Sequence, residues 1–101
     1  MTNGKAYSGP KLGFLGVGNM GGALVRAARR NTPPTGICVA NRSPEKAKAL
    51  AEEISCRVKT NAELAEWADY LFLGVKPQMM GDLLAEIGPV LRQRQDRFLL
   101  V

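Results

Sequence analysis

The sequence predicts an α/β fold in which helices wind on both faces of a parallel sheet. Short apolar runs alternate with amphipathic helical stretches, the run at 70–75 is apolar along its whole length, and a glycine-rich turn follows the first run. Such alternation is typical of parallel sheets, and a continuously apolar strand is typical of one that helices cover on both faces. The 101 residues are enough for one domain with a single core.

The first strand is expected over 11–15 and the first helix over 20–30. This helix is predicted to bury one stripe of small and aliphatic side chains, namely Ala23, Leu24, Ala27 and Ala28. Arg29 and Arg30 suit the negative, carboxyl-terminal end of the helix dipole. The polar and proline-containing segment 31–36 then predicts a loop.

The second strand is expected over 37–40, and Ser43 followed by Pro44 predicts the N-cap and first turn of a second helix. The core stripe of that helix is predicted to be Ala47, Leu50, Ala51 and Ile54. After a short third strand around 56–59, Thr60 and Glu63 have the spacing of a capping box. The third helix that they start is predicted to bury Leu64, Trp67 and Ala68.

The fourth strand is expected over 70–75, and the helix after it over about 78–91. The core positions of that helix are predicted to be Leu83, Leu84, Ile87 and Leu91. A fifth strand at 98–101 is apolar up to its final residue. A doubly wound sheet does not normally end there, so we expect a fragment of a longer protein. The polar residues 1–10 are expected to form a flexible tail.

Composition excludes several classes of protein. The formal charge of +5 comes from scattered basic residues, so nucleic acid is not the expected partner. No segment is apolar enough to span a membrane and no signal peptide is present, so a cytoplasmic protein is predicted. Cys38 and Cys56 have no metal-ligand spacing and are expected to be core thiols, and no metal site is predicted.

The glycine-rich turn carries the strongest functional signal. Gly16, Gly18 and Gly21 have G-x-G-x-x-G spacing between a strand and a helix. In Rossmann-type NAD(P)-binding domains these positions permit a sharp turn, close approach of backbone amides to a pyrophosphate, and close helix packing. The amino end of the helix also favours an anion. The sequence therefore predicts a dinucleotide site, although a plain glycine-rich turn is the alternative.

The end of the second strand bears on the choice of cofactor. NAD-selective sites usually have Asp or Glu there, which binds the ribose 2′-hydroxyl. This chain has Asn41, Arg42 and Ser43 instead, so nothing repels a 2′-phosphate and Arg42 can pair with it. NADP is therefore predicted, with NAD possible. The alternative is a structural turn with a solvated arginine and a helix cap.

A third candidate segment follows the fourth strand. Pro77 restricts Lys76 to an extended conformation, so the strand is expected to continue to the rim of the sheet. Gly74 and Val75 would then offer a thin backbone edge to a cofactor, with the Lys76 ammonium at the mouth. The alternative is an exposed lysine beside a loop proline.

Four segments together resemble pyrroline-5-carboxylate reductase: the loop 15–21, the polar turn 41–43, Asn61, and the run 68–78. The similarity extends over about 11–101 and covers only the amino-terminal, cofactor-binding half of that family. The Val-Lys-Pro-Gln segment at 75–78 is the more distinctive motif, since many dehydrogenases share the glycine loop.

This resemblance implies reduction of the cyclic imine pyrroline-5-carboxylate to proline by NADPH or NADH, the last step of proline biosynthesis. By position, the pyrophosphate would be held by Leu15, Gly16, Val17, Gly18, Asn19 and Met20. The adenosine ribose and its phosphate would contact Asn41, Arg42 and Ser43, and the adenine side would contact Asn61, for which helix capping is the alternative. The nicotinamide arm would be lined by Gly74, Val75, Lys76 and Pro77.

In that family the substrate lies between this domain and a helical carboxyl-terminal domain that also forms the dimer. The parent is therefore expected to be a homo-oligomer, and the isolated chain is expected to be inactive. No catalytic residue is assigned to it. The alternatives are another NADP-dependent β-hydroxyacid or imine reductase, and a non-catalytic module that binds NADP(H).

Overall fold

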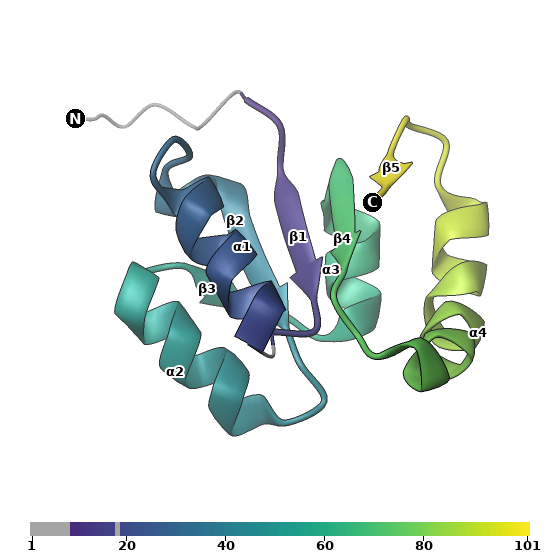
Figure 1. The fold of residues 1–101 in the computed structure, drawn as a ribbon. Coiled ribbons are helices and arrows are strands. Elements are labelled where there is room, and N and C mark those ends of the chain that lie inside the picture. The colour runs from purple at the N-terminus through teal and green to yellow at the C-terminus, as the bar shows by residue number, and fades with distance from the viewer. Residues whose placement is uncertain (1–8, 18) are drawn as a thin grey trace.

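The computed structural model describes residues 9–17 and 19–101. Its centre is a five-stranded sheet of order β3-β2-β1-β4-β5, in which every pairing is parallel (Figure 1). The strands are β1 (Leu12–Leu15), β2 (Ile37–Ala40), β3 (Arg57–Val58), β4 (Tyr70–Leu73) and β5 (Leu99–Leu100). The helices are α1 (Asn19–Arg29), η1 (Pro34–Gly36), α2 (Pro44–Ile54), α3 (Asn61–Trp67) and α4 (Pro77–Gln93). This confirms the predicted doubly wound α/β fold. Most of the predicted tail, 1–8, lies outside the described residues.

The helices cover the two faces of the sheet in pairs. Phe14 and Val39 pack with α1 and α2 on one face, whereas Leu15 and Cys38 pack with α3 and α4 on the other. This separation follows from the alternation of side chains along a strand. Phe14 also stacks on Phe72 of β4, with ring centroids 4.6 Å apart. Figure 1 shows α1 and α2 on the β3–β2 side and α4 beside β4 and β5.

Several local predictions are confirmed. Ser43 is the N-cap of α2 and Pro44 its first residue, while Ala47, Leu50 and Ala51 are buried and Ile54 packs against them. The capping box of α3 forms, because the Glu63 amide donates to Thr60 Oγ1 at 3.1 Å and Glu63 Oε1 accepts from the Thr60 amide at 2.9 Å. On α3, Leu64 and Ala68 are buried and Trp67 is half-buried.

The predicted core stripe of α1 is wrong. Ala23, Leu24 and Ala27 are exposed and Ala28 is only half-buried, while Val25 is fully buried. Val25 packs with Phe14 and Val39 of the sheet, whereas Leu24, the largest residue of the predicted stripe, is 50% exposed. Arg29 is then directed at α2, where its Nε donates to the Ile54 carbonyl at 3.0 Å.

The region around β4 and α4 also differs from expectation. Leu83 and Ile87 are buried, but Leu84 is 41% exposed and Leu91 only half-buried. Likewise, β4 is not covered along its whole length, because Tyr70 is 40% exposed. Tyr70 pairs with Leu99 of β5, the edge strand of the sheet. No described helix is long and apolar enough to pass through a lipid bilayer.

The two thiols lie on opposite faces of the sheet. Cys38 is buried with the α3–α4 cluster, and Cys56 is half-buried beside the α1–α2 cluster. Burial raises the pKa of Cys56 to about 11, so this thiol stays protonated at neutral pH. Cys38 is therefore a core thiol, as the sequence predicts, whereas Cys56 is only half-buried at the edge of the core.

Candidate cofactor cleft

The carboxyl ends of β1, β2 and β4 meet at a cleft of about 290 Å³. Six residues singled out in the sequence line it: Leu15, Gly16, Asn41, Arg42, Asn61 and Val75. The opposite wall is a face of α4 formed by Met79, Asp82, Leu83 and Glu86. In open parallel sheets a ligand binds outside the carboxyl ends of the strands, where the winding reverses direction. Since β1 lies between β2 and β4, this cleft occupies that point.

Backbone forms the floor where Gly16 lines the cleft, because Gly16 there touches Gly74, which does not line the cleft itself. Gly16 has a φ of +91°, and a Cβ placed on it would lie 2.8 Å from the Gly74 carbonyl carbon and oxygen. A Cβ on Gly74 would in turn lie 2.7 Å from the Gly16 oxygen. The Gly74 amide donates to the Leu15 carbonyl at 2.7 Å and the Gly16 amide to the Ala40 carbonyl at 2.8 Å. The chain turns sharply here with no side chain, which fits the approach of a diphosphate to backbone amides.

The tip of β2 is linked to the glycine loop through one side chain. Asn41 Oδ1 accepts a hydrogen bond from the Val17 amide at 3.1 Å, and its Nδ2 donates to the Ser43 carbonyl at 3.2 Å. Both contacts are partly buried. The polar turn at 41–43 and the loop after β1 therefore form one connected surface.

Arg42 lies on the rim with an exposed side chain. Its Nη1 donates to Met79 Sδ at 3.5 Å, across the mouth of the cleft. Thioether sulfur is a weak acceptor, so this contact leaves the guanidinium able to pair with a stronger anionic ligand.

The far wall was not anticipated from the sequence. Asn61 is the first residue of α3, and its Nδ2 donates to Glu86 Oε1 at 3.1 Å. Asp82 lies one turn before Glu86 on the same face of α4. The helical spacing of Asp82 and Glu86 around the core residue Leu83 could have predicted that both lie on one face of α4. Only the packing of α4 beside α3 shows that this face is turned toward Arg42. Arg42 is thus accompanied by two carboxylates in this cleft.

Lys76, together with Val17, lies apart from the predicted residues that line the cleft. It lines a second hollow with Val17, Arg26, Lys46 and Glu53, on the side of α1 and α2. Lys76 is extended, with φ −65° and ψ 149°, as the following proline predicts. Pro77 begins α4, and neither Pro77 nor Ser43 lines the cleft itself.

The remaining predicted residues belong to the start of α1. Gly18 lies outside the described residues. Asn19, Met20 and Gly21 form the first turn of α1, and their side chains lie outside the described part of the chain. Contact of these residues with a pyrophosphate stays a prediction.

Comparison with known proteins agrees with this geometry. Residues 11–100 match the family described as NADP oxidoreductase, coenzyme F420-dependent. The chain belongs to this family. It is thus a domain of the NAD(P)-dependent oxidoreductase type, with a Rossmann-like fold.

The chain is also related to pyrroline-5-carboxylate reductases. It is 39% identical to the enzyme of Escherichia coli over 80 residues, which are 76% of this chain and 30% of that protein. The structure of the Coxiella burnetii enzyme superposes with a TM-score of 0.74 at 29% identity, covering 84% of this chain and 32% of the other. The structure of the Plasmodium falciparum enzyme, solved with NADP bound, superposes with a TM-score of 0.70 at 27% identity and covers 93% of this chain and 33% of the other. The chain thus spans about a third of the length of these relatives.

Proposed function

We propose that this chain is the NADP(H)-binding domain of an enzyme that reduces pyrroline-5-carboxylate to proline. The observation that carries the proposal is the glycine contact between the tips of β1 and β4, beside a β2 tip that presents Arg42. That floor leaves backbone for a diphosphate, and Arg42 offers a forked cation for a 2′-phosphate. Relatedness to pyrroline-5-carboxylate reductases supports the choice of substrate.

In this proposal the chain binds and orients the cofactor. NADPH, once bound, supplies the hydride that reduces the imine carbon. Residues 15–20 hold the pyrophosphate, and Arg42 and Ser43 bind the phosphorylated ribose. Asn61 contacts the adenine side, and residues 74–77 line the nicotinamide arm. Positioning of the reacting atoms is the contribution that a domain of this kind makes to the rate. The substrate-binding and dimer-forming domain, with the proton donor, belongs to the remainder of a longer protein.

The cofactor part of the proposal is tested by titrating this chain with NADPH and NADH and following the fluorescence of the reduced nicotinamide. We expect tighter binding of NADPH. Arg42→Asp should weaken NADPH by about thirtyfold relative to NADH, because a charge-assisted pair is replaced by a repulsive one. Lys48→Asp on the exposed face of α2 is the matched control and should change both affinities little. Equal losses for the two cofactors in Arg42→Asp would show that Arg42 does not bind the 2′-phosphate.

The substrate is tested with the complete protein. Turnover of pyrroline-5-carboxylate with NADPH is the expected result, and oxidation of a β-hydroxyacid instead would assign it to another reductase class. Binding of NADPH without turnover of either substrate would favour a non-catalytic NADP(H)-binding module.

A further inference from the structure

The Asn41 side chain occupies the position at which NAD-selective domains carry an acid that binds the ribose. Here its amide is already engaged by the protein on both sides. Oδ1 accepts from the Val17 amide at 3.1 Å and Nδ2 donates to the Ser43 carbonyl at 3.2 Å. Because Val17 offers only a donor and Ser43 only an acceptor, these partners determine which way the amide faces.

These partners also account for asparagine at this position. A carboxylate could accept from the Val17 amide, but its second oxygen would face the Ser43 carbonyl, where two acceptors repel each other. An aliphatic side chain would leave the partly buried Val17 amide without this partner, which is costly. An uncharged side chain with one acceptor and one donor satisfies both groups.

The contact matters because of where Val17 lies. Gly16 and Gly74 are tied to the neighbouring strands by backbone hydrogen bonds to Ala40 and Leu15. The next described residue along the chain is Val17, and its amide is held by Asn41 alone among the hydrogen bonds of residues 9–17 and 19–101. The Asn41 side chain thus extends the anchoring of the loop by one residue toward the predicted pyrophosphate site.

We propose that Asn41 is a positioning residue, which orders the glycine loop for the pyrophosphate, and that the choice between NADPH and NADH is left to Arg42. The inference rests on the proposed function, since it concerns how the same cofactor is bound. It replaces the predicted role of Asn41 as a ligand of the ribose phosphate. Both cofactors carry the pyrophosphate and only one carries the 2′-phosphate, so the two roles have different consequences.

The test compares Asn41→Ala with its neighbour Arg42→Ala, using titrations with NADPH and NADH. Asn41→Ala should weaken the binding of NADPH and of NADH by about fivefold each. The ratio of the two affinities should therefore stay within about twofold of its original value. Arg42→Ala should weaken NADPH by about tenfold while NADH changes little. A loss confined to NADPH in Asn41→Ala, or no loss with either cofactor, would overturn the positioning role.

A second measurement needs no cofactor. Hydrogen exchange of the Val17 amide in the ligand-free chain should become about tenfold faster in Asn41→Ala and remain unchanged in Arg42→Ala. The Gly16 amide, which donates to the Ala40 carbonyl, serves as the internal reference and should change less than twofold. Equal acceleration at Gly16 and Val17 would indicate general loosening of the sheet and contradict the proposal. If the unaltered chain binds neither dinucleotide, the proposed function fails, whereas a failure in Asn41→Ala alone removes only this inference.

Discussion

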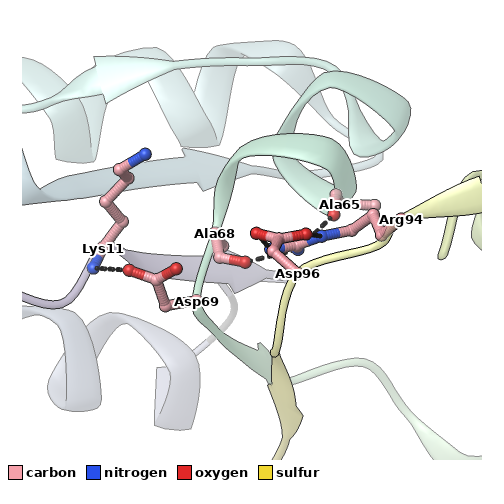
Figure 2. A network of polar contacts seen from close by, with 6 residues as sticks. All are labelled: Lys11, Ala65, Ala68, Asp69, Arg94 and Asp96. Atoms are coloured by element: carbon pink, nitrogen blue, oxygen red, sulfur yellow. Dashed lines mark hydrogen bonds and ion pairs between the residues drawn. The ribbon is translucent and has the colours of Figure 1, made fainter.

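The two ends of the parallel sheet are built in different ways. At the amino ends of the strands, charged side chains are joined to protein groups (Figure 2). The Lys11 amide donates to Asp69 Oδ2 at 2.9 Å, and Arg94 donates to the Ala65 and Ala68 carbonyls at the end of α3 at 2.9 and 2.5 Å. Arg94 also forms a two-bond pair with Asp96, and its side chain is only 5% exposed.

At the carboxyl ends, the strands are joined by glycine backbone and one asparagine amide. The charged side chains at this end, Arg42, Asp82 and Glu86, line an open cleft instead of forming ion pairs with one another. From this contrast we infer that the amino ends contribute mainly to stability and that the charges at the carboxyl ends are available to a ligand.

The largest effect is expected at the glycine floor. Gly16→Ala should lower the free energy of unfolding by about 4 kcal/mol, because the new Cβ combines a positive φ with a clash against the Gly74 backbone. Urea unfolding followed by circular dichroism measures this. Gly81→Ala on α4 is the matched control, since its Cβ would meet nothing within 4 Å, and it should stabilise by about 0.5–1 kcal/mol. If Gly16→Ala lowered the free energy of unfolding only slightly, the loop would be able to accommodate a Cβ, and the predicted clash with Gly74 would be wrong.

The next largest effect is expected at Arg94, at the amino ends of the strands. Arg94→Ala should lower the free energy of unfolding by about 3 kcal/mol, because it removes a buried cation that bonds the last carbonyls of α3. The ratio of NADPH to NADH affinity should stay unchanged. Arg92→Ala is the control, because Arg92 is an exposed arginine in the last turn of α4, and it should alter stability little. A change in cofactor preference in Arg94→Ala would contradict the division between the two ends.

A smaller effect is expected on the acidic wall of the cleft. Asp82→Asn removes one of two carboxylates that share the cleft with Arg42, so it should raise NADPH affinity by about twofold. NADH should gain less, because it carries fewer negative charges. Glu52→Gln, on the carboxyl-terminal half of α2, is the control of equal charge change. Weaker binding of NADPH in Asp82→Asn would mean that Asp82 holds the ligand.

The smallest effect is the response to acid. Hydrogen bonds from the Thr60 amide and from Arg94 lower the pKa values of Glu63 and Asp96, respectively. A carboxyl whose pKa is lower in the folded state stabilises the fold above its unfolded pKa, and this contribution is lost as pH falls through the folded value. Stability should therefore decline below about pH 4. Asp96→Asn should show a shallower decline between pH 5 and 3 in urea titrations, and an unchanged profile would refute the assignment.

Local signals in the sequence predicted most of the fold. Thr60 and Glu63 form the capping box, and Ser43 and Pro44 begin α2, because these structures depend on residues close together in the chain. The buried stripe of α2 was predictable because its periodic residues include Leu50, whose size sets the packing face. The stripe of α1 was not, because Leu24 and Val25 are adjacent and the helical pattern alone does not show which of them faces the sheet.

The cleft was predicted in part. The glycine spacing and the strand tips brought Gly16, Asn41, Arg42 and Val75 together because parallel strands end at the same edge. Lys76 falls in another hollow, and Glu86 joins Asn61 across the cleft. The first outcome depends on how the end of β4 lies beside α1 and α2, and the second on how α4 packs against α3. No local pattern encodes either arrangement.

The sequence by itself determined the order of strands and helices, the sharp turn at Gly16 and the charge at the β2 tip, because each depends on residue type or short-range spacing. Only the tertiary structure decided that the Asn41 side-chain amide bonds both Val17 and Ser43. The same is true of the hydrogen bonds from Arg94 to the last carbonyls of α3, and of the acidic residues of α4 that share the cleft with Arg42. Apart from the local Asn41–Ser43 hydrogen bond, those contacts join residues far apart in the chain, and their geometry exists only after the helices have packed on the sheet.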